Sequence, residues 1–154
     1  MVEYITRFFW EIFQSGLLLD ELMHGVVAFP FACFLWFKSH SVRQVIVFYL
    51  VVYFIDSDHL VDYWLFWGFG FDAMRFFGLD FFKMGATFIL PFHAWEWVII
   101  MSVFVYRKGR LKWKSVLASI MLAVFAHLLW DIHNFWSVEF YSIFYRAING
   151  FRFG

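Results

Sequence analysis

Residues 54–64 read "FIDSDHLVDYW" and follow directly on the apolar run of residues 45–54, "VIVFYLVVYF". The run has the composition of a membrane-spanning helix, whereas the stretch after it carries Asp56, Asp58, His59 and Asp62 within seven residues. Ionisable groups at membrane depth are costly unless a partner or a bound ion compensates them. We therefore expect polar groups from other parts of the chain to lie beside this stretch.

The composition of the chain predicts an all-α integral membrane protein. Of its 154 residues, 64% are hydrophobic and 27% are aromatic, and the mean hydropathy is +0.72. These values exceed those of ordinary water-soluble domains. A chain of this length supplies roughly four spans of about 20 residues, so we expect residues 1–154 to form a single transmembrane helical domain.

Four apolar segments are predicted to be transmembrane helices, because a helix satisfies its own backbone hydrogen bonds in lipid. They cover residues 17–37, 42–55, 87–106 and 115–130. Pro30 and Pro91 are expected to kink the first and the third. Residues 1–16 are predicted to form an interfacial amphipathic helix. Residues 63–82 hold ten aromatic residues and are predicted to lie at the membrane interface.

The basic residues predict the orientation of this bundle. Seven of the 12 Lys and Arg residues lie in the two loops that join the first span to the second and the third to the fourth, and neither loop holds an acid. Because Lys and Arg concentrate in cytoplasmic loops, we expect both loops in the cytoplasm. Both termini and the acidic residues then face the extracytoplasmic side.

With this orientation, each span brings His and acidic residues to the same outer end. The first span contributes Asp20, Glu21 and His24; the second Asp56, Asp58, His59 and Asp62; the third His93 and Glu96; the fourth His127 and Asp131. One such residue alone is typically an interfacial anchor or a helix-end hydrogen-bonding group. Four groups built from imidazoles and carboxylates instead indicate one shared metal site, because Zn²⁺, Mn²⁺ and Fe²⁺ take these ligands.

The motifs also resemble a known family. "MHG" at residues 23–25, "DSDH" at 56–59, His93 and "HLLWD" at 127–131 are similar, in type and order, to the motifs of the YdjM-like family of predicted membrane-bound metal-dependent hydrolases. The family is distantly similar to the zinc phospholipase C and single-strand nuclease group. The resemblance covers residues 23–136 and implies zinc-dependent phosphoester hydrolysis in a bacterial or archaeal cytoplasmic membrane.

Two positions depart from the family pattern. Ile55 precedes Asp56 where the family has proline, and the third motif reads "HAWEW" at residues 93–97, where the family has a His-Arg-Gly start and a second histidine about a turn later. Either Glu96 replaces that second ligand, or the number of metal ions differs.

The resemblance and the residues together predict a ligand set for one to three divalent ions, with zinc expected and manganese or iron as alternatives. The predicted ligands are His24, Asp56, His59, His93, His127 and Asp131. Glu96 or Asp58 is predicted to be the general base or to orient a ligand. In this mechanism the metal lowers the pKa of a bound water toward ~7 and polarises the phosphoryl oxygen.

A site at membrane depth favours a lipid or other amphiphilic phosphoester as substrate. Nucleic acid is not expected as a partner, because the acidic residues would repel a polyanion. An ion pathway is not expected, since the cytoplasmic halves of the spans hold no acid or histidine. A membrane desaturase is not expected either, because that class has more histidines than the six present here. A non-catalytic protein with a structural metal site remains an alternative, because sequence does not distinguish a closed site from an open one.

The predicted orientation can be tested with a single cysteine at Gly109, in the second basic loop, in a chain whose Cys33 is replaced by serine. In intact cells this cysteine should be shielded from a membrane-impermeant thiol reagent and should react after the cells are permeabilised. A cysteine at Gly70, outside the basic loops, is the control and should react in intact cells. Ready labelling at Gly109 would invert the orientation.

Overall fold

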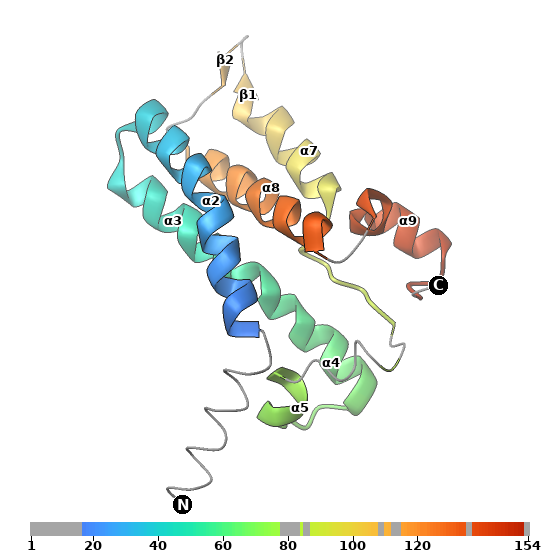
Figure 1. Cartoon of the computed structure of the whole chain (residues 1–154). Coiled ribbons are helices and arrows are strands. Elements are labelled where there is room, and N and C mark those ends of the chain that lie inside the picture. Colours follow the sequence, from blue (N-terminus) through green and yellow to red (C-terminus); the bar gives the residue numbers. More distant parts are fainter. Residues whose placement is uncertain are drawn as a thin grey trace, which may run out of the picture.

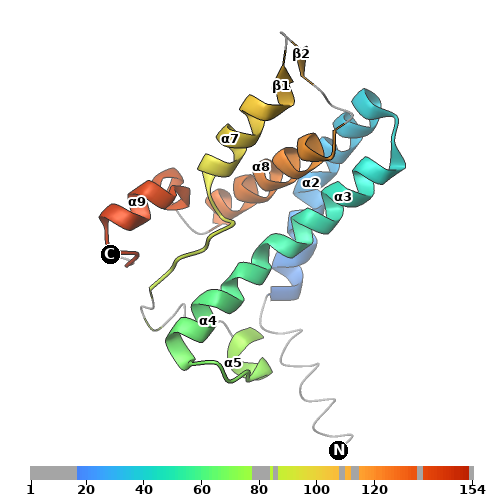
Figure 2. The same ribbon diagram turned by 180° about the vertical axis from the view of Figure 1, so that it is seen from behind.

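The structure is a computed structural model that describes residues 17–77, 84, 87–107, 110–111, 115–134 and 137–152 (Figures 1 and 2). The regular secondary structure of the described part is helical, apart from a hairpin of two short strands, β1 (Tyr106–Arg107) and β2 (Arg110–Leu111), and one isolated bridge between Thr87 and Arg152. The interfacial helix predicted for residues 1–16 lies outside the described residues, as does part of the aromatic connection.

Helix α8 (Val116–Asn134) is the centre of the bundle. It packs against α2 (Leu17–Ser39), α3 (Val42–Phe54) and α7 (Trp95–Val105), and α2 also packs against α3 (Figure 1). Alanines line part of this contact and are fully or almost fully buried: Ala28, Ala32, Ala123 and Ala126. Small side chains of this kind allow helix backbones to approach closely within a membrane.

Three helical segments are long and apolar enough to cross a membrane: Leu19–Ser39, Val42–Trp67 and Val116–His133. They correspond to the first, second and fourth predicted spans. The second is longer than predicted, because α3 continues through a 3₁₀ turn, η1 (Ile55–Asp58), into α4 (His59–Trp67). Gly68 then ends the helix with a φ of 83°, a conformation that favours glycine. The polar stretch of residues 56–62 is therefore helical.

The third predicted span is helical only in its second half. Residues 88–94 form an irregular segment, which we call the His93 segment, and α7 begins at Trp95. Pro91 thus precedes the helix and does not kink it, whereas Pro30 lies within α2. Proline disfavours helical geometry at the residue before it, and Leu90 has a φ of 42°.

Two carboxylates of the second span satisfy the backbone of the His93 segment. Asp62 accepts hydrogen bonds from the N–H groups of Ile89, over 2.7 Å, and Leu90, over 3.3 Å. Asp58 accepts one from the N–H of Phe92 over 2.7 Å. Buried backbone donors need such partners wherever the helix is interrupted, so these acids stabilise a conformation that an apolar sequence would not keep alone.

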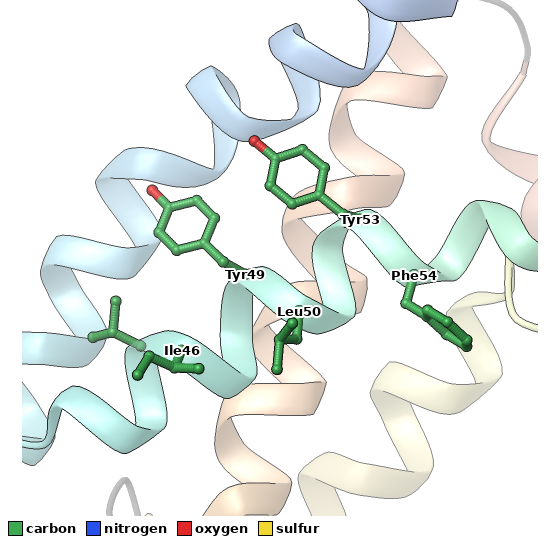
Figure 3. A pocket seen from close by; sticks show the side chains of 6 residues that line it. Ile46, Tyr49, Leu50, Tyr53 and Phe54 are labelled. Atoms are coloured by element: carbon green, nitrogen blue, oxygen red, sulfur yellow. The ribbon is translucent and has the colours of Figure 1, made fainter.

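The outer surface of the bundle is strongly apolar. Figure 3 shows one shallow pocket on α3, where Ile46, Tyr49, Leu50, Tyr53 and Phe54 project from the helix. Leu50 and Phe54 are 64% and 70% exposed. Large aliphatic and aromatic side chains exposed in a continuous patch mark a surface that contacts another apolar phase.

One buried polar pair lies between the helices, far from the outer polar groups. The Ser119 hydroxyl on α8 donates to the Gln44 side-chain carbonyl on α3 over 2.8 Å, and both residues are buried. We expect Ser119→Ala to lower the free energy of unfolding by about 1–3 kcal/mol, because it leaves the Gln44 carbonyl without this donor. The double substitution Gln44→Met with Ser119→Ala should recover most of that loss, since both polar partners are then removed.

Unfolding in detergent, followed by circular dichroism, measures these changes. The control is Ser102→Ala, because Ser102 makes a local bond to the Ile99 carbonyl on an exposed part of α7. If Ser119→Ala costs no more than this control, the buried pair does not contribute as described.

Candidate metal centre

Four elements bring imidazoles and carboxylates together at one end of α8. They are the first turns of α2, the junction of η1 and α4, the His93 segment and the last turns of α8. Three overlapping groups have ligand atoms within 4.8 Å of one another: His24, His127 and Asp131; Asp56, His93 and His127; Asp58, His59 and His93. These groups contain all six predicted metal ligands, together with Asp58.

The second group has the closest contacts. Nε2 of His93 lies 3.1 Å from Nε2 of His127. Oδ1 of Asp56 lies 3.1 Å from the first of these nitrogens and 3.3 Å from the second. The same oxygen lies 3.3 Å from Nε2 of His59. One carboxylate oxygen therefore faces three imidazole nitrogens that come from three different elements.

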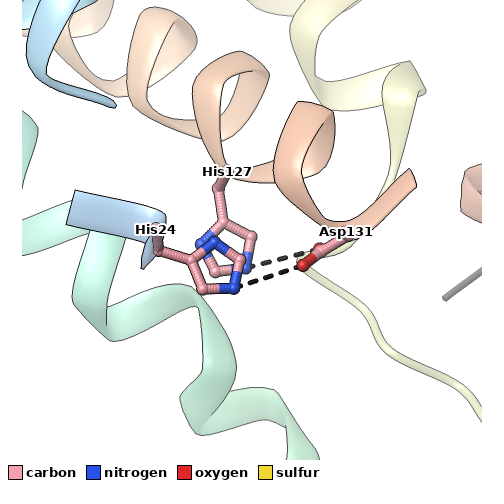
Figure 4. A group of neighbouring side chains, drawn as sticks. All are labelled: His24, His127 and Asp131. Carbon is pink, nitrogen blue, oxygen red and sulfur yellow. Dashed lines mark ion pairs between the residues drawn. The ribbon is translucent and has the colours of Figure 1, made fainter. Parts of the chain in front are cut away.

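Asp131 connects this group to His24. Its Oδ1 lies 3.3 Å from Nε2 of His24, and its Oδ2 lies 3.5 Å from Nε2 of His127 and 3.6 Å from Nε2 of His93. Figure 4 shows the two ion pairs that Asp131 forms with His24 and His127. The rings of these histidines stack with their centroids 3.8 Å apart and their planes 9° apart.

The hydrogen bonds made by Nδ1 of His93 and by Nδ1 of His127 fix the tautomers of these two histidines. Nδ1 of His127 lies 2.9 Å from the backbone carbonyl of Val52, and a carbonyl only accepts hydrogen bonds. Nδ1 of His93 lies 3.0 Å from the carboxylate of Asp58, which also only accepts when ionised. Both Nδ1 atoms must therefore carry a proton. In the neutral rings, both Nε2 atoms then present lone pairs toward each other and toward Asp56.

Such an arrangement can hold a cation at its centre. Two lone pairs and two carboxylates face one another in a buried space, and the His24, His93 and His127 side chains are at most 3% exposed. Ligand atoms that lie about 2.0–2.2 Å from a tetrahedral zinc ion are roughly 3.3–3.6 Å apart. The distances of 3.1–3.6 Å among the Nε2 atoms and the carboxylate oxygens are close to this spacing. The residues present therefore fit a divalent metal ion.

Two acids at the start of α2 extend the centre beyond the predicted ligands. Asp20 lies 3.7 Å from Nε2 of His24 and accepts a hydrogen bond of 2.7 Å from the Trp130 indole. Glu21 lies beside Asp56. The sequence places both acids at the outer end of the first span, with Asp20 one helical turn from His24, but only the packing of α2 against α8 shows that Asp20 reaches Trp130.

Arg146 holds the His93 segment in place and was not predicted. It lies on α9 (Ile143–Ile148), and its guanidinium donates to the carbonyls of Leu90, His93 and Phe140 over 2.9–3.2 Å. It is 2% exposed. Burial lowers its pKa from the ordinary value, while Asp58 opposes that change, and arginine stays charged in either case. A basic residue near the chain end gave no sequence signal for this role.

Glu96 lies in the first turn of α7, and its described contacts point away from the three groups. Its Oε1 accepts a hydrogen bond of 2.6 Å from the Ser142 hydroxyl and one of 3.4 Å from the N–H of Phe144. The carboxylate thus joins α7 to the start of α9. Its predicted role as base or replacement ligand remains a prediction that these contacts do not favour.

Comparison of the chain with models of known protein families, with curated proteins and with solved structures found no match.

The hydrogen bond between His93 and Asp58 leads us to expect that a substitution of Asp58 changes the affinity of the centre for zinc. We expect Asp58→Asn to weaken zinc binding by ~10–100-fold, the usual effect of removing a carboxylate that orients a ligating histidine. Competition with a chromophoric chelator, on purified protein in detergent, measures this affinity. Glu139→Gln makes the same change of charge on an exposed residue and should leave it unchanged. Equal affinities of the two variants would show that Asp58 does not orient a ligand.

Proposed function

We propose that this chain is a membrane-embedded, metal-dependent hydrolase that acts on a phosphoester of a lipid or another amphiphilic molecule. The observation that carries the proposal is the pair of Nε2 atoms of His93 and His127, 3.1 Å apart and both facing Asp56. A divalent metal ion accounts for this convergence of imidazoles and carboxylates, and zinc is an ion that such a set commonly binds.

Membrane insertion is supported by the helices and by their outer surface. Three segments have the length and hydropathy of spans, and side chains such as Leu50 and Phe54 are largely exposed. In a bilayer these side chains contact hydrocarbon and no longer face water. The acid-free basic loops support an orientation with the centre on the extracytoplasmic side of a bacterial or archaeal cytoplasmic membrane.

The residues around the centre have two roles, to hold the ion and to form the edge that a substrate reaches. A divalent ion, when bound, would supply Lewis-acid activation of water and of the phosphoryl oxygen. His24, His93, His127 and Asp131 are closed in by packing and would hold the ion together with Asp56. Asp56 and His59 are 18% and 17% exposed, so they form the edge that a substrate reaches.

Of the two acids considered as base or orienter, we assign orientation to Asp58 and no catalytic role to Glu96. Asp58 is already engaged by Nδ1 of His93 and by the N–H of Phe92, which leaves it poorly placed to take a proton from water. Glu96 is engaged by Ser142. Membership of the YdjM-like family is part of this proposal and rests on the motifs at residues 23–25, 56–59 and 127–131.

A structural metal site is the second candidate function. The burial of His24 and His127, whose side chains are 1% and 0% exposed, favours it, because a structural ion is coordinatively closed. The partial exposure of Asp56 and His59 favours the hydrolase instead.

The test of the proposal combines metal analysis with turnover. Protein purified in detergent without chelators should contain zinc or another divalent transition metal, and His127→Ala should lose it. The metal-loaded protein should hydrolyse at least one member of a panel of phospholipids, isoprenoid phosphates and simple phosphoesters. Metal-loaded protein without any such turnover would leave the structural site as the preferred function. If the purified protein contains no metal and added Zn²⁺ or Mn²⁺ does not stabilise it, both the hydrolase and the structural metal site are ruled out.

The substitution Glu96→Gln tests our assignment of no catalytic role to Glu96, and it does so without testing the hydrolase proposal itself. We expect it to keep both metal content and turnover. If turnover falls by ~10²–10⁴, the usual contribution of a positioned acid or base, while the metal stays bound, then Glu96 is the base and our assignment is wrong.

A further inference from the structure

An apolar groove runs between α3, α7 and α8 and has a volume of about 320 Å³. Its walls include Val51 and Ile55 from the second span, Ile120 and Val124 from α8, Met101 from α7, and Phe92 from the His93 segment. A pocket of this size is at the lower end of the range for small-molecule sites.

Two walls of the groove continue directly into the candidate metal centre. On the second span, Val51 and Ile55 lie four residues apart in the helix, and Asp58 follows Ile55 by three residues in the 3₁₀ turn η1, where side chains at this spacing lie above one another. On α8, Ile120, Val124 and His127 follow at intervals of four and three. Residues with these spacings lie on one face of a helix. The groove therefore shares a face with Asp58 on the second span and with His127 on α8, and these two helices pack together.

The third wall joins the centre through the chain itself. Phe92 lies next to His93, and its N–H donates to Asp58, the carboxylate that also contacts Nδ1 of His93. Because Phe92 and Ile55 immediately precede His93 and Asp56, the groove ends beside the two ligand residues that lie 3.1 Å apart.

The groove offers nothing to a polar ligand. Its lining residues are aliphatic or aromatic apart from Met101. Trp97 also lines it, but its indole N–H donates to the Pro91 carbonyl over 2.6 Å, which leaves the ring face for apolar contact. A polar molecule would lose hydrogen bonds to water here without replacement, whereas a hydrocarbon chain would lose none.

We propose that this groove binds the hydrocarbon chain of an amphiphilic substrate, with the polar head at the edge formed by Asp56 and His59. This inference rests on the proposed function and deepens it by assigning the site that selects the substrate chain. The direction of the groove agrees with it. From the metal centre it follows α3 and α8 toward Ile120, toward the basic-loop end of the bundle, so the chain would point into the membrane while the head stays at the outer end.

The chain site can be tested with two phosphonates that share a head group and are not hydrolysed, hexadecylphosphonate and butylphosphonate. Two substitutions fill the groove from different helices, Ile120→Trp on α8 and Met101→Trp on α7. The control is Ile100→Trp, which adds the same bulk at an exposed position of α7 that does not line the groove. All proteins are zinc-loaded and held in the same detergent, so the partition of the long chain into micelles is the same for each.

We expect the wild type to bind hexadecylphosphonate more tightly than butylphosphonate, because only the long chain fills the groove. Each groove substitution should lower the affinity for hexadecylphosphonate by about tenfold or more. Loss of contact with a few buried methylene groups produces an effect of this size. Neither should change zinc content or the affinity for butylphosphonate. The control should bind both compounds as the wild type does.

Two results would overturn the chain site. One is equal binding of the two phosphonates by the zinc-loaded wild type, and the other is unchanged long-chain binding by both groove variants. Failure of the hydrolase proposal gives a different pattern, in which the wild type binds the long chain in the groove but turns over no phosphoester. If one groove variant loses zinc, it has failed to fold, and the other variant decides the result.

Discussion

The hydrogen bond from Nδ1 of His127 to the Val52 carbonyl is the contact on which the centre depends. It joins α8 to α3 at the depth where α3 gives way to the 3₁₀ turn η1, and it sets the tautomer of the histidine that belongs to two of the three groups. A stretch of 3₁₀ geometry within a long helix often marks a functional position. Here the 3₁₀ turn begins three residues after Val52 and contains Asp56 and Asp58. One short segment therefore contributes the Val52 carbonyl and two carboxylates to the same centre.

Much of the fold and of the centre follows from the sequence, because hydropathy and helical spacing are local signals. The first, second and fourth spans and the gathering of the six predicted ligands are of this kind. The His93 segment is different. Its residues are as apolar as those of a span, and the groups that hold it out of a helix, Asp62, Asp58 and Arg146, lie about 30 to 60 residues away in the chain. No local pattern reports such contacts.

The same segment explains why Glu96 was given a role that its contacts do not favour. If residues 87–106 were one helix, His93 and Glu96 would share a face at a spacing of three. The helix begins at Trp95, and so the two side chains follow separate paths, His93 toward Asp58 and His127 and Glu96 toward Ser142. A three-residue spacing identifies a shared face only where the backbone between the two residues is helical.

The division of exposure around the centre sets the direction from which a substrate can approach. His24, His93 and His127 are enclosed by α2, α8 and the His93 segment, and Arg146 holds this segment through the backbone carbonyls of Leu90 and His93. Asp56 and His59 stay partly open, on the helix that also forms a wall of the apolar groove. A water-soluble molecule would meet only the polar edge. In the function that we propose, an amphiphile that moves within the plane of the bilayer would place its head on that edge and its chain in the groove at once, and for this reason we propose a lipid as the substrate.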